Sequence, residues 1–326
     1  MRVGVIGTGA MGQNHIKTYS RMQDVDLVGI ADIDRARVEH LSRQYSVKGF
    51  TDYNDLLKES LDAISVVVPT SLHKKVGLDV IASGTSLLME KPIADSTENG
   101  LELVNAAERE GVKLMVGHIE RFNPAVIMAK ELIDSGILGK VVLVSTRRAG
   151  PYNPRIRDAG VILDIGVHDV DIISYFYNSR VSEVYAVAGK DIHAFEDRAS
   201  ILMRFPGDRA GIVETDWLTP HRARSFTIIG TSAVAYGDYI EQKLMIHEKD
   251  WIREARIDKK EPLTLELESF LKACRDGSGI VTTGEDGVHT LKVAMASIRS
   301  YMTRAPVEIT PIDSRVDAGR TYEAVV

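Results

Sequence analysis

The chain has 326 residues, of which 44% are hydrophobic and 26% charged, as expected for an ordinary globular protein of two domains. Its formal net charge of -6 comes from acids and bases mixed along the sequence, so we expect no nucleic-acid partner and no attraction to anionic lipid. No apolar stretch approaches the length of a membrane span and no signal-peptide pattern is present, which predicts a cytoplasmic protein without a membrane partner, and the single cysteine excludes internal disulfides.

A glycine-rich turn follows the first predicted strand. The apolar run of residues 3–6 leads into the sequence Gly7-Thr8-Gly9-Ala10-Met11-Gly12, after which apolar residues recur at helical spacing. In such a strand–turn–helix unit the first glycine makes the tight turn, the second lets the backbone approach phosphates, and the third lets the helix pack on its strand. The helix N-terminus adds N–H groups and a positive dipole end. Three glycines in six residues also occur in ordinary loops, but this context predicts a dinucleotide site.

Asp32 ends the next predicted strand, 20 positions after Gly12. An acid at this spacing binds the ribose 2′-hydroxyl of NAD and repels the 2′-phosphate of NADP. The alternative is a solvated strand-end residue or a helix cap. We therefore predict NAD as the cofactor, while Arg35 and Arg37 close behind leave NADP open.

Strand and helix signals alternate through the first third of the chain. Helices are predicted at 35–45, 52–59, 72–83 and 97–110, and strands at 48–50, 63–69, 86–90 and 113–118. Several of these strands are continuously apolar, which is typical of a parallel sheet covered on both faces. We predict an α/β, doubly wound Rossmann domain over residues 1–120.

Polar residues follow three strands of this predicted domain. Ligands of doubly wound sheets bind beyond the carboxyl ends of the strands. We assign cofactor binding to Pro69, Thr70, His73, Glu90 and Lys91, and substrate binding to Lys91, His118, Glu120 and Arg121. Pro92 fixes the turn after Lys91, so the ammonium group could be directed toward the nicotinamide. A surface lysine at a strand end is the equally weighted alternative.

The pattern changes near residue 121. A helix at 125–135, a strand at 141–147 and an apolar helix at 161–177 precede strands at 181–188, 199–205, 211–217, 225–230 and 243–247. Successive strands without helices between them indicate an antiparallel sheet. We predict an α+β domain over residues 121–326, whose sheet carries helices on one face and can self-associate through the other.

The apolar helix at 161–177 carries ionisable side chains at i, i+4 and i+7, namely Asp164, His168 and Asp171. On an α-helix they would share one face, and their burial would require partners. A carboxylate four residues from a histidine can orient and stabilise the imidazolium, so Asp164 and His168 predict a general acid/base pair. A core histidine capped by a carboxylate is the alternative. The spacing of zinc ligands is missing from the sequence, so we predict no metal.

Four arginines lie in eleven residues before this helix: Arg147, Arg148, Arg155 and Arg157. Prolines and Tyr152 interrupt them, which predicts a stiff cationic loop. Guanidinium groups bind phosphate bidentately, so Tyr152, Arg155 and Arg157 are candidate ligands of an anionic substrate such as a nucleotide sugar. A solvated basic loop or an inter-subunit patch is equally expected.

Together, the glycine turn, Glu90-Lys91-Pro92 and Asp164-x-x-x-His168 resemble the glucose-fructose oxidoreductase, inositol dehydrogenase and rhizopine-catabolism (Gfo/Idh/MocA) family over nearly the whole chain. The resemblance implies a Rossmann domain plus a large, mostly antiparallel sheet, often in homodimers or homotetramers. It also implies that Lys91, Asp164 and His168 are the catalytic trio. The segment from Pro311 to Val326 has no predicted role.

The segments 69–74 and 117–124 and the pair Arg155 and Arg157 resemble the subgroup of this family that oxidises the 3-hydroxyl of UDP-N-acetylglucosamine with NAD. In the implied reaction, His168 takes the hydroxyl proton, Asp164 stabilises the imidazolium and Lys91 holds the oxygen, and Lys91 and His168 could exchange roles. A dehydrogenase or reductase of a free polyol or sugar, of the inositol or anhydrofructose type, is the alternative. A non-catalytic dinucleotide-binding regulator is a third.

Overall fold

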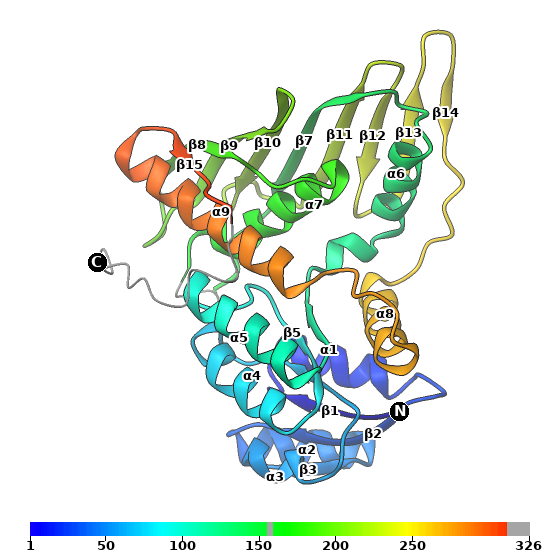
Figure 1. The fold of residues 1–326 in the computed structure, drawn as a ribbon, viewed down its shortest axis with the longest axis vertical. Helices are drawn as coiled ribbons and strands as arrows, with labels where there is room; N and C mark the ends of the chain where they lie inside the picture. Colours follow the sequence, from blue (N-terminus) through cyan, green and yellow to red (C-terminus); the bar gives the residue numbers. More distant parts are fainter. Residues whose placement is uncertain (155–158, 312–326) are drawn as a thin grey trace. The chain divides into compact units, whose positions relative to one another are not determined.

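The computed structural model describes residues 1–154 and 159–311, which divide into two compact units (Figure 1). Residues 1–118 and 263–288 form the first unit, and residues 119–262 and 289–311 form the second. The chain thus leaves the first unit close to residue 120, where the sequence predicts a domain boundary. At residue 263 the chain returns to the first unit, so a single domain boundary does not describe how the chain is divided.

The first unit is built on a six-stranded parallel sheet with the order β3-β2-β1-β4-β5-β6. Its strands are β1 (Arg2–Ile6), β2 (Asp26–Ala31), β3 (Lys48–Phe50), β4 (Ala63–Val66), β5 (Ser86–Met89) and β6 (Leu114–Val116). All four residues of β4 are buried, as expected for a strand covered on both faces. The predicted doubly wound fold is confirmed, and its strand order reverses between β1 and β4, where such folds bind dinucleotides.

The helices of this unit begin and end close to their sequence signals. They are α1 (Ala10–Tyr19), α2 (Arg35–Tyr45), α3 (Tyr53–Leu57), η1 (Thr70–Leu72), α4 (His73–Ala82) and α5 (Thr97–Glu110). Asp34 caps α2 by accepting from the Arg37 amide, and Ser96 caps α5 by accepting from the Asn99 amide. Both helices match the predicted ranges because a polar cap opens each one.

The returning segment contains α8 (Pro262–Asp276) and joins the edge of the sheet at β6. The Val116 amide donates to the Thr282 carbonyl at 3.0 Å, and the Thr282 hydroxyl donates to the Val116 carbonyl at 2.6 Å. Leu267, Phe270 and Leu271 are buried. The segment covers an edge strand that would otherwise expose its backbone groups, which explains why it belongs to this unit.

The second unit is built on a nine-stranded sheet with the order β14-β13-β12-β11-β7-β10-β9-β8-β15. Its strands are β7 (Val141–Ala149), β8 (Glu183–Gly189), β9 (Arg198–Phe205), β10 (Arg209–Asp216), β11 (Ala223–Gly230), β12 (Val234–Asp238), β13 (Lys243–His247), β14 (Ile252–Glu254) and β15 (Val307–Glu308). Only β7 and β10 pair in parallel among the described strands of this sheet. The predicted mostly antiparallel sheet is confirmed.

Helices cover one face of this sheet (Figure 1). They are η2 (Ile119–Phe122), α6 (Pro124–Asp134), η3 (Ile162–Gly166), α7 (Val167–Tyr177) and the part of α9 (Gly284–Thr303) that follows Val288. Along β9 every second residue is buried under the helices, and Leu202 and its alternate neighbours point to the open face. No helix in the described part of the chain is both long and apolar enough to cross a membrane.

Candidate active site

The glycine turn joins β1 to α1 and leaves room for a bound group. Gly7 has a φ of +93°, and a Cβ atom there would lie 2.2 Å from the Val67 carbonyl oxygen. A Cβ atom at Gly12 would lie 2.0 Å from the Gly7 carbonyl oxygen. At Gly9, an added Cβ atom meets no described atom within 4 Å. The turn itself requires the first and third glycines, whereas the second keeps open the space where a pyrophosphate fits.

The residues between these glycines complete the cradle. Ala10 and Met11 open α1, and Gly9 at its N-cap provides no side-chain acceptor for the first helical N–H groups. Those groups are therefore suited to an anion, with the helix dipole adding to the attraction. Thr8 is fully buried, and both its amide and its hydroxyl donate to Asp32. The turn thus fits a dinucleotide.

Asp32 lies directly beside the turn, at the end of β2. Its Oδ2 atom accepts from the Thr8 amide at 2.7 Å, and its Oδ1 atom accepts from the Asp34 amide at 2.9 Å. Burial acts to raise the pKa of Asp32, but these hydrogen bonds and Arg37, 3.4 Å away, outweigh it and hold the pKa below its ordinary value. Asp32 is therefore an ionised acceptor, as binding of a ribose hydroxyl requires.

The predicted strand-end residues lie side by side, because β4, β5 and β6 are neighbours in the sheet. Pro69 is exposed and Thr70 half-buried, while Lys91 is half-buried in the turn after β5. His73 and His118 are buried. The two ring nitrogens of His73 lie 2.8 Å and 2.9 Å from the carbonyl oxygens of Pro92 and Val68. His73 thus contacts protein backbone at both nitrogens, which is a use the sequence does not predict.

In the second unit, Asp164 and His168 are half-buried near the start of the apolar helix. Asp164 lies in η3, a π-helical turn, and His168 is the second residue of α7. Asp171 is 1% exposed and pairs with Arg121, so it has the partner that its burial requires.

Two buried ion pairs hold the helix that carries His168. The Arg121 guanidinium donates to both carboxylate oxygens of Asp171, at 2.8 Å from Nε and 2.6 Å from Nη2. Arg148 Nε donates to Asp169 at 2.9 Å, and Arg148 Nη1 donates to Glu120 at 2.7 Å. These five residues are at most 7% exposed. Glu120 and Arg121, predicted as substrate ligands, therefore have structural partners inside the unit.

The predicted cationic loop has a different structure where it is described. Strand β7 continues to Ala149, so Arg147 lies in the strand predicted over 141–147, and Arg148 belongs to that strand and not to the predicted loop. Tyr152 stacks on His193 with ring centroids 3.8 Å apart and lies 5.1 Å from the ring of Trp217. Arg155 and Arg157 lie outside the described residues, as does the predicted tail beyond Pro311.

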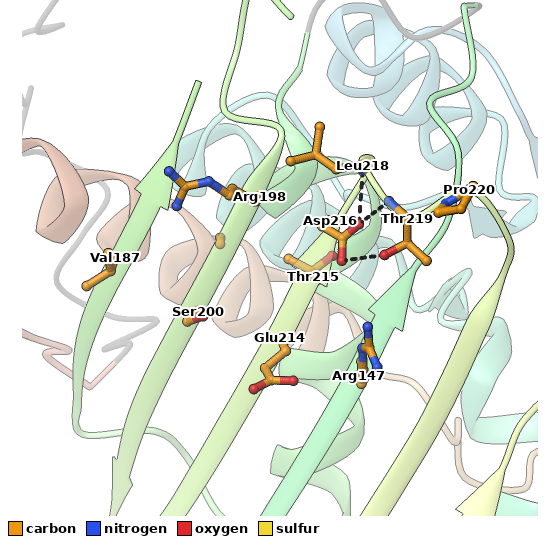
Figure 2. A pocket seen from close by; sticks show the side chains of 11 residues that line it. Arg147, Val187, Arg198, Ser200, Glu214, Thr215, Asp216, Leu218, Thr219 and Pro220 are labelled. Atoms are coloured by element: carbon orange, nitrogen blue, oxygen red, sulfur yellow. Dashed lines mark hydrogen bonds between the residues drawn. The ribbon is translucent and has the colours of Figure 1, made fainter. Parts of the chain in front are cut away.

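Arg147 points to the open face of the sheet, where it lines a cavity of about 500 Å³ (Figure 2). The cavity also contains Arg198, Glu214 and Asp216. Asp216 orders its rim by accepting from the amides of Leu218 and Thr219 at 2.9 Å and 2.7 Å. The cavity lies on the sheet face opposite to the one that the helices cover.

Several residues with specific roles are absent from the sequence-based predictions. The sequence does not predict the pair of Arg148 and Asp169, because it joins a strand to a helix. His15 lies 3.1 Å from Glu90, and its only sequence signal is a polar residue on an otherwise apolar helix face. No group of three or more histidine, cysteine or acidic side chains in the described ranges could hold a metal ion.

Comparison with known proteins places this geometry in a family. Residues 1–118 match the model of an oxidoreductase family with an NAD-binding Rossmann fold, and residues 126–236 match the GFO/IDH/MocA C-terminal domain. The chain belongs to the Gfo/Idh/MocA family. It therefore has an NAD-binding Rossmann domain and is an oxidoreductase that acts on CH–OH groups.

Two relatives are named for different substrates. The UDP-N-acetylglucosamine 3-dehydrogenase of Acidithiobacillus ferrooxidans is 27% identical, over 93% of this chain and 99% of that protein. Its solved structure matches with a TM-score of 0.87 at 26% identity, covering 93% of this chain and 98% of that one. The scyllo-inositol 2-dehydrogenase (NAD+) of Bacillus subtilis is 26% identical, over 95% of this chain and 96% of that protein.

Proposed function

We propose that this protein oxidises the 3-hydroxyl of UDP-N-acetylglucosamine to a ketone, with NAD as the hydride acceptor. The observation that carries the proposal is the 27% identity to an enzyme of that activity across nearly the full length of both chains. The Gly7–Gly12 cradle and the ionised Asp32 support NAD, because they fit a pyrophosphate and a ribose hydroxyl.

Lys91, Asp164 and His168 are the proposed catalytic residues. His168 accepts the proton of the sugar hydroxyl, and this raises the electron density on the carbon that gives up hydride. Asp164 stabilises the resulting imidazolium, and Lys91 donates a hydrogen bond to the same oxygen. Bound NAD supplies the acceptor for the hydride. The ion pairs of Asp169 and Asp171 support this assignment, since they anchor the helix directly after His168.

The proposed substrate ligands also include Tyr152, Arg155, Arg157, His118, Glu120 and Arg121. Tyr152 belongs to an aromatic cluster with His193 and Trp217, so it offers a packed ring rather than a mobile one. Arg155 and Arg157 would bind the diphosphate. His118, Glu120 and Arg121 remain proposed substrate residues, although the paired state of the latter two favours a supporting role.

Incubation with NAD and UDP-N-acetylglucosamine tests the proposal. We expect NADH formation and a nucleotide-sugar product two hydrogens lighter by mass spectrometry. Lys91→Met and His168→Ala should abolish turnover while NAD binding survives. Turnover of free inositol but not of the nucleotide sugar would instead favour the second candidate, a polyol dehydrogenase, which the 26% identity to an inositol dehydrogenase supports. Binding of NAD without turnover of any sugar would contradict both.

We also propose that the protein is a homodimer or homotetramer assembled through the open face of the second sheet. One cross-strand row on this face contains Tyr185, Leu202 and Ile212, and the side chain of Leu202 is 51% exposed. The next row pairs Glu214 with Arg147. Such a face, apolar with charges of both signs side by side, is self-complementary when a two-fold axis relates two copies.

A further inference from the structure

The turn that carries Lys91 is held on both sides by buried histidines. On its N-terminal side, the Lys91 amide donates to the Glu90 carboxylate at 3.2 Å. The other oxygen of that carboxylate lies 3.1 Å from His15 Nε2. On its C-terminal side, the Pro92 carbonyl oxygen lies 2.8 Å from His73 Nδ1. The backbone is therefore tied immediately before and immediately after Lys91.

The His15 side continues as a chain of hydrogen bonds. The second ring nitrogen of His15 lies 3.0 Å from the Ser65 hydroxyl, which lies 2.9 Å from the Tyr19 hydroxyl. A carboxylate only accepts, so His15 Nε2 carries the proton and donates to Glu90. A neutral imidazole then accepts from Ser65 at Nδ1, and the Ser65 oxygen accepts from Tyr19, whereas an imidazolium would donate to Ser65. In both forms the His15 ring donates to Glu90.

Burial makes this arrangement rigid. His15, Ser65 and Tyr19 are fully buried, and Glu90 is 8% exposed. A Cβ atom at Gly117 would lie only 3.1 Å from the Glu90 carboxyl carbon, so the glycine leaves just enough room for that side chain. Burial acts to raise the pKa of Glu90, but the contacts with His15 and Lys91 outweigh it and hold the pKa below its usual range. Glu90 is therefore an ionised acceptor for both His15 and the Lys91 amide.

The His73 side ties the same turn to the neighbouring strand. His73 Nε2 lies 2.9 Å from the carbonyl oxygen of Val68, which follows β4. His73 is 1% exposed, and it opens α4. Its ring therefore lies between the segments that follow β4 and β5. Burial lowers the pKa of His73, and a neutral ring donates to one of the two carbonyls at a time. A buried imidazole between two backbone carbonyls leaves neither nitrogen directed at a ligand, which favours a supporting role over contact with the cofactor.

We propose that His15 and His73 are positioning residues that fix the direction of the Lys91 side chain by holding the backbone on either side of it. The inference rests on the proposed role of Lys91. Neither histidine takes part in the reaction itself. Because a catalytic group that is displaced by about 1 Å loses roughly a hundredfold in rate, loosening either end of the turn lowers kcat more than it weakens NAD binding.

The test compares His15→Leu, His15→Gln and His73→Leu with His289→Leu. Gln can donate to Glu90 and accept from Ser65, whereas Leu does neither. His289 is a matched control, because it is buried and accepts a backbone amide (Val181) in the other unit. Turnover is measured per NAD-binding site, so that loss of folded protein does not count as loss of rate.

We expect kcat to fall at least about tenfold in both Leu variants at the turn, with the Kd of NAD changed less than about twofold. His15→Gln should retain most of the rate, and His289→Leu should keep kcat even where its melting temperature falls. Normal kcat in His15→Leu and His73→Leu would overturn the inference. Weaker NAD binding with unchanged kcat in His73→Leu would make His73 a cofactor ligand and overturn its positioning role.

Two further measurements separate this inference from the proposed function. Lys91→Met is assayed in parallel, and normal turnover there would refute the role of Lys91 itself rather than that of the histidines. In the cofactor-free protein, 15N NMR should show His15 protonated at Nε2. A proton on Nδ1 alone would contradict the donation from His15 to Glu90.

Discussion

At the scale of single residues, the distance of Asp32 from Gly12 in the sequence leads to a prediction, and its contacts in the structure add to that prediction. Its partner Thr8 is close because β1 and β2 are adjacent parallel strands, and its partner Asp34 is two residues further along the chain. The distance to Gly12 alone predicts that Asp32 lies beside the glycine turn, where the structure has it. The sequence could not predict that Asp32 also secures the turn, since the Thr8 amide contributes no side-chain signal.

Replacement of Asp32 should therefore change stability as well as cofactor binding. The pKa of Asp32 is lower in the folded state than its ordinary value, so its stabilising effect is present above the unfolded pKa and is lost as the pH falls through the folded one. We expect Asp32→Asn to lower the free energy of unfolding by about 1–2 kcal/mol at pH 7 in urea titrations. The difference should shrink near pH 3. The exposed Asp26→Asn serves as control, and an equal loss at both pH values would contradict the linkage.

At the scale of elements, the helix that carries His168 shows what periodicity alone can and cannot predict. The apolar run predicts a buried helix over 161–177, and the structure places η3 and α7 there. The sequence shows that Asp171 needs a partner but cannot name Arg121, which is 50 residues away and in another element. Short strands such as β12 are missed for a related reason, because Gly237 interrupts the alternation on which strand prediction depends.

The ion pair between Arg148 on β7 and Asp169 on α7 gives a test at this scale. Arg148→Met leaves the buried Asp169 without its hydrogen-bonded cation and Glu120 with Arg224 alone, 3.6 Å away, which we expect to cost about 3–5 kcal/mol of unfolding free energy. Arg148→Met combined with Asp169→Leu should recover part of that loss, because the buried carboxylate that lost its cation is then removed. Urea titrations of both variants measure this. The exposed pair of Arg204 and Glu183 provides the control, since Arg204→Met should cost less than about 1 kcal/mol. If the variant with both Arg148→Met and Asp169→Leu were less stable than Arg148→Met alone, the expectation would be contradicted.

At the scale of the whole molecule, the order of the predicted elements gives the fold class, but it does not show which exposed residues lie next to each other on the surface. Alternating strands and helices suffice for the first sheet, because only a parallel arrangement buries both of its faces. The second sheet buries one face under helices and leaves the other with alternate residues exposed. Sequence alternation predicts that the open face exists, but the cross-strand register that aligns Tyr185, Leu202 and Ile212 comes only from the structure.

In the proposed interface, this alignment puts Leu202 at the centre. A stable dimer buries on the order of 800 Å² per partner, and a charge placed without a partner in the middle of that area opposes association. We therefore expect Leu202→Glu to sediment with the mass of a smaller species than the parent protein at micromolar concentration. Met302→Glu is the matched control, because Met302 is an exposed apolar side chain on α9, away from the open face, and should leave the mass unchanged. A parent protein that sediments as a monomer, or a Leu202→Glu variant of unchanged mass, would show that this face does not form the interface.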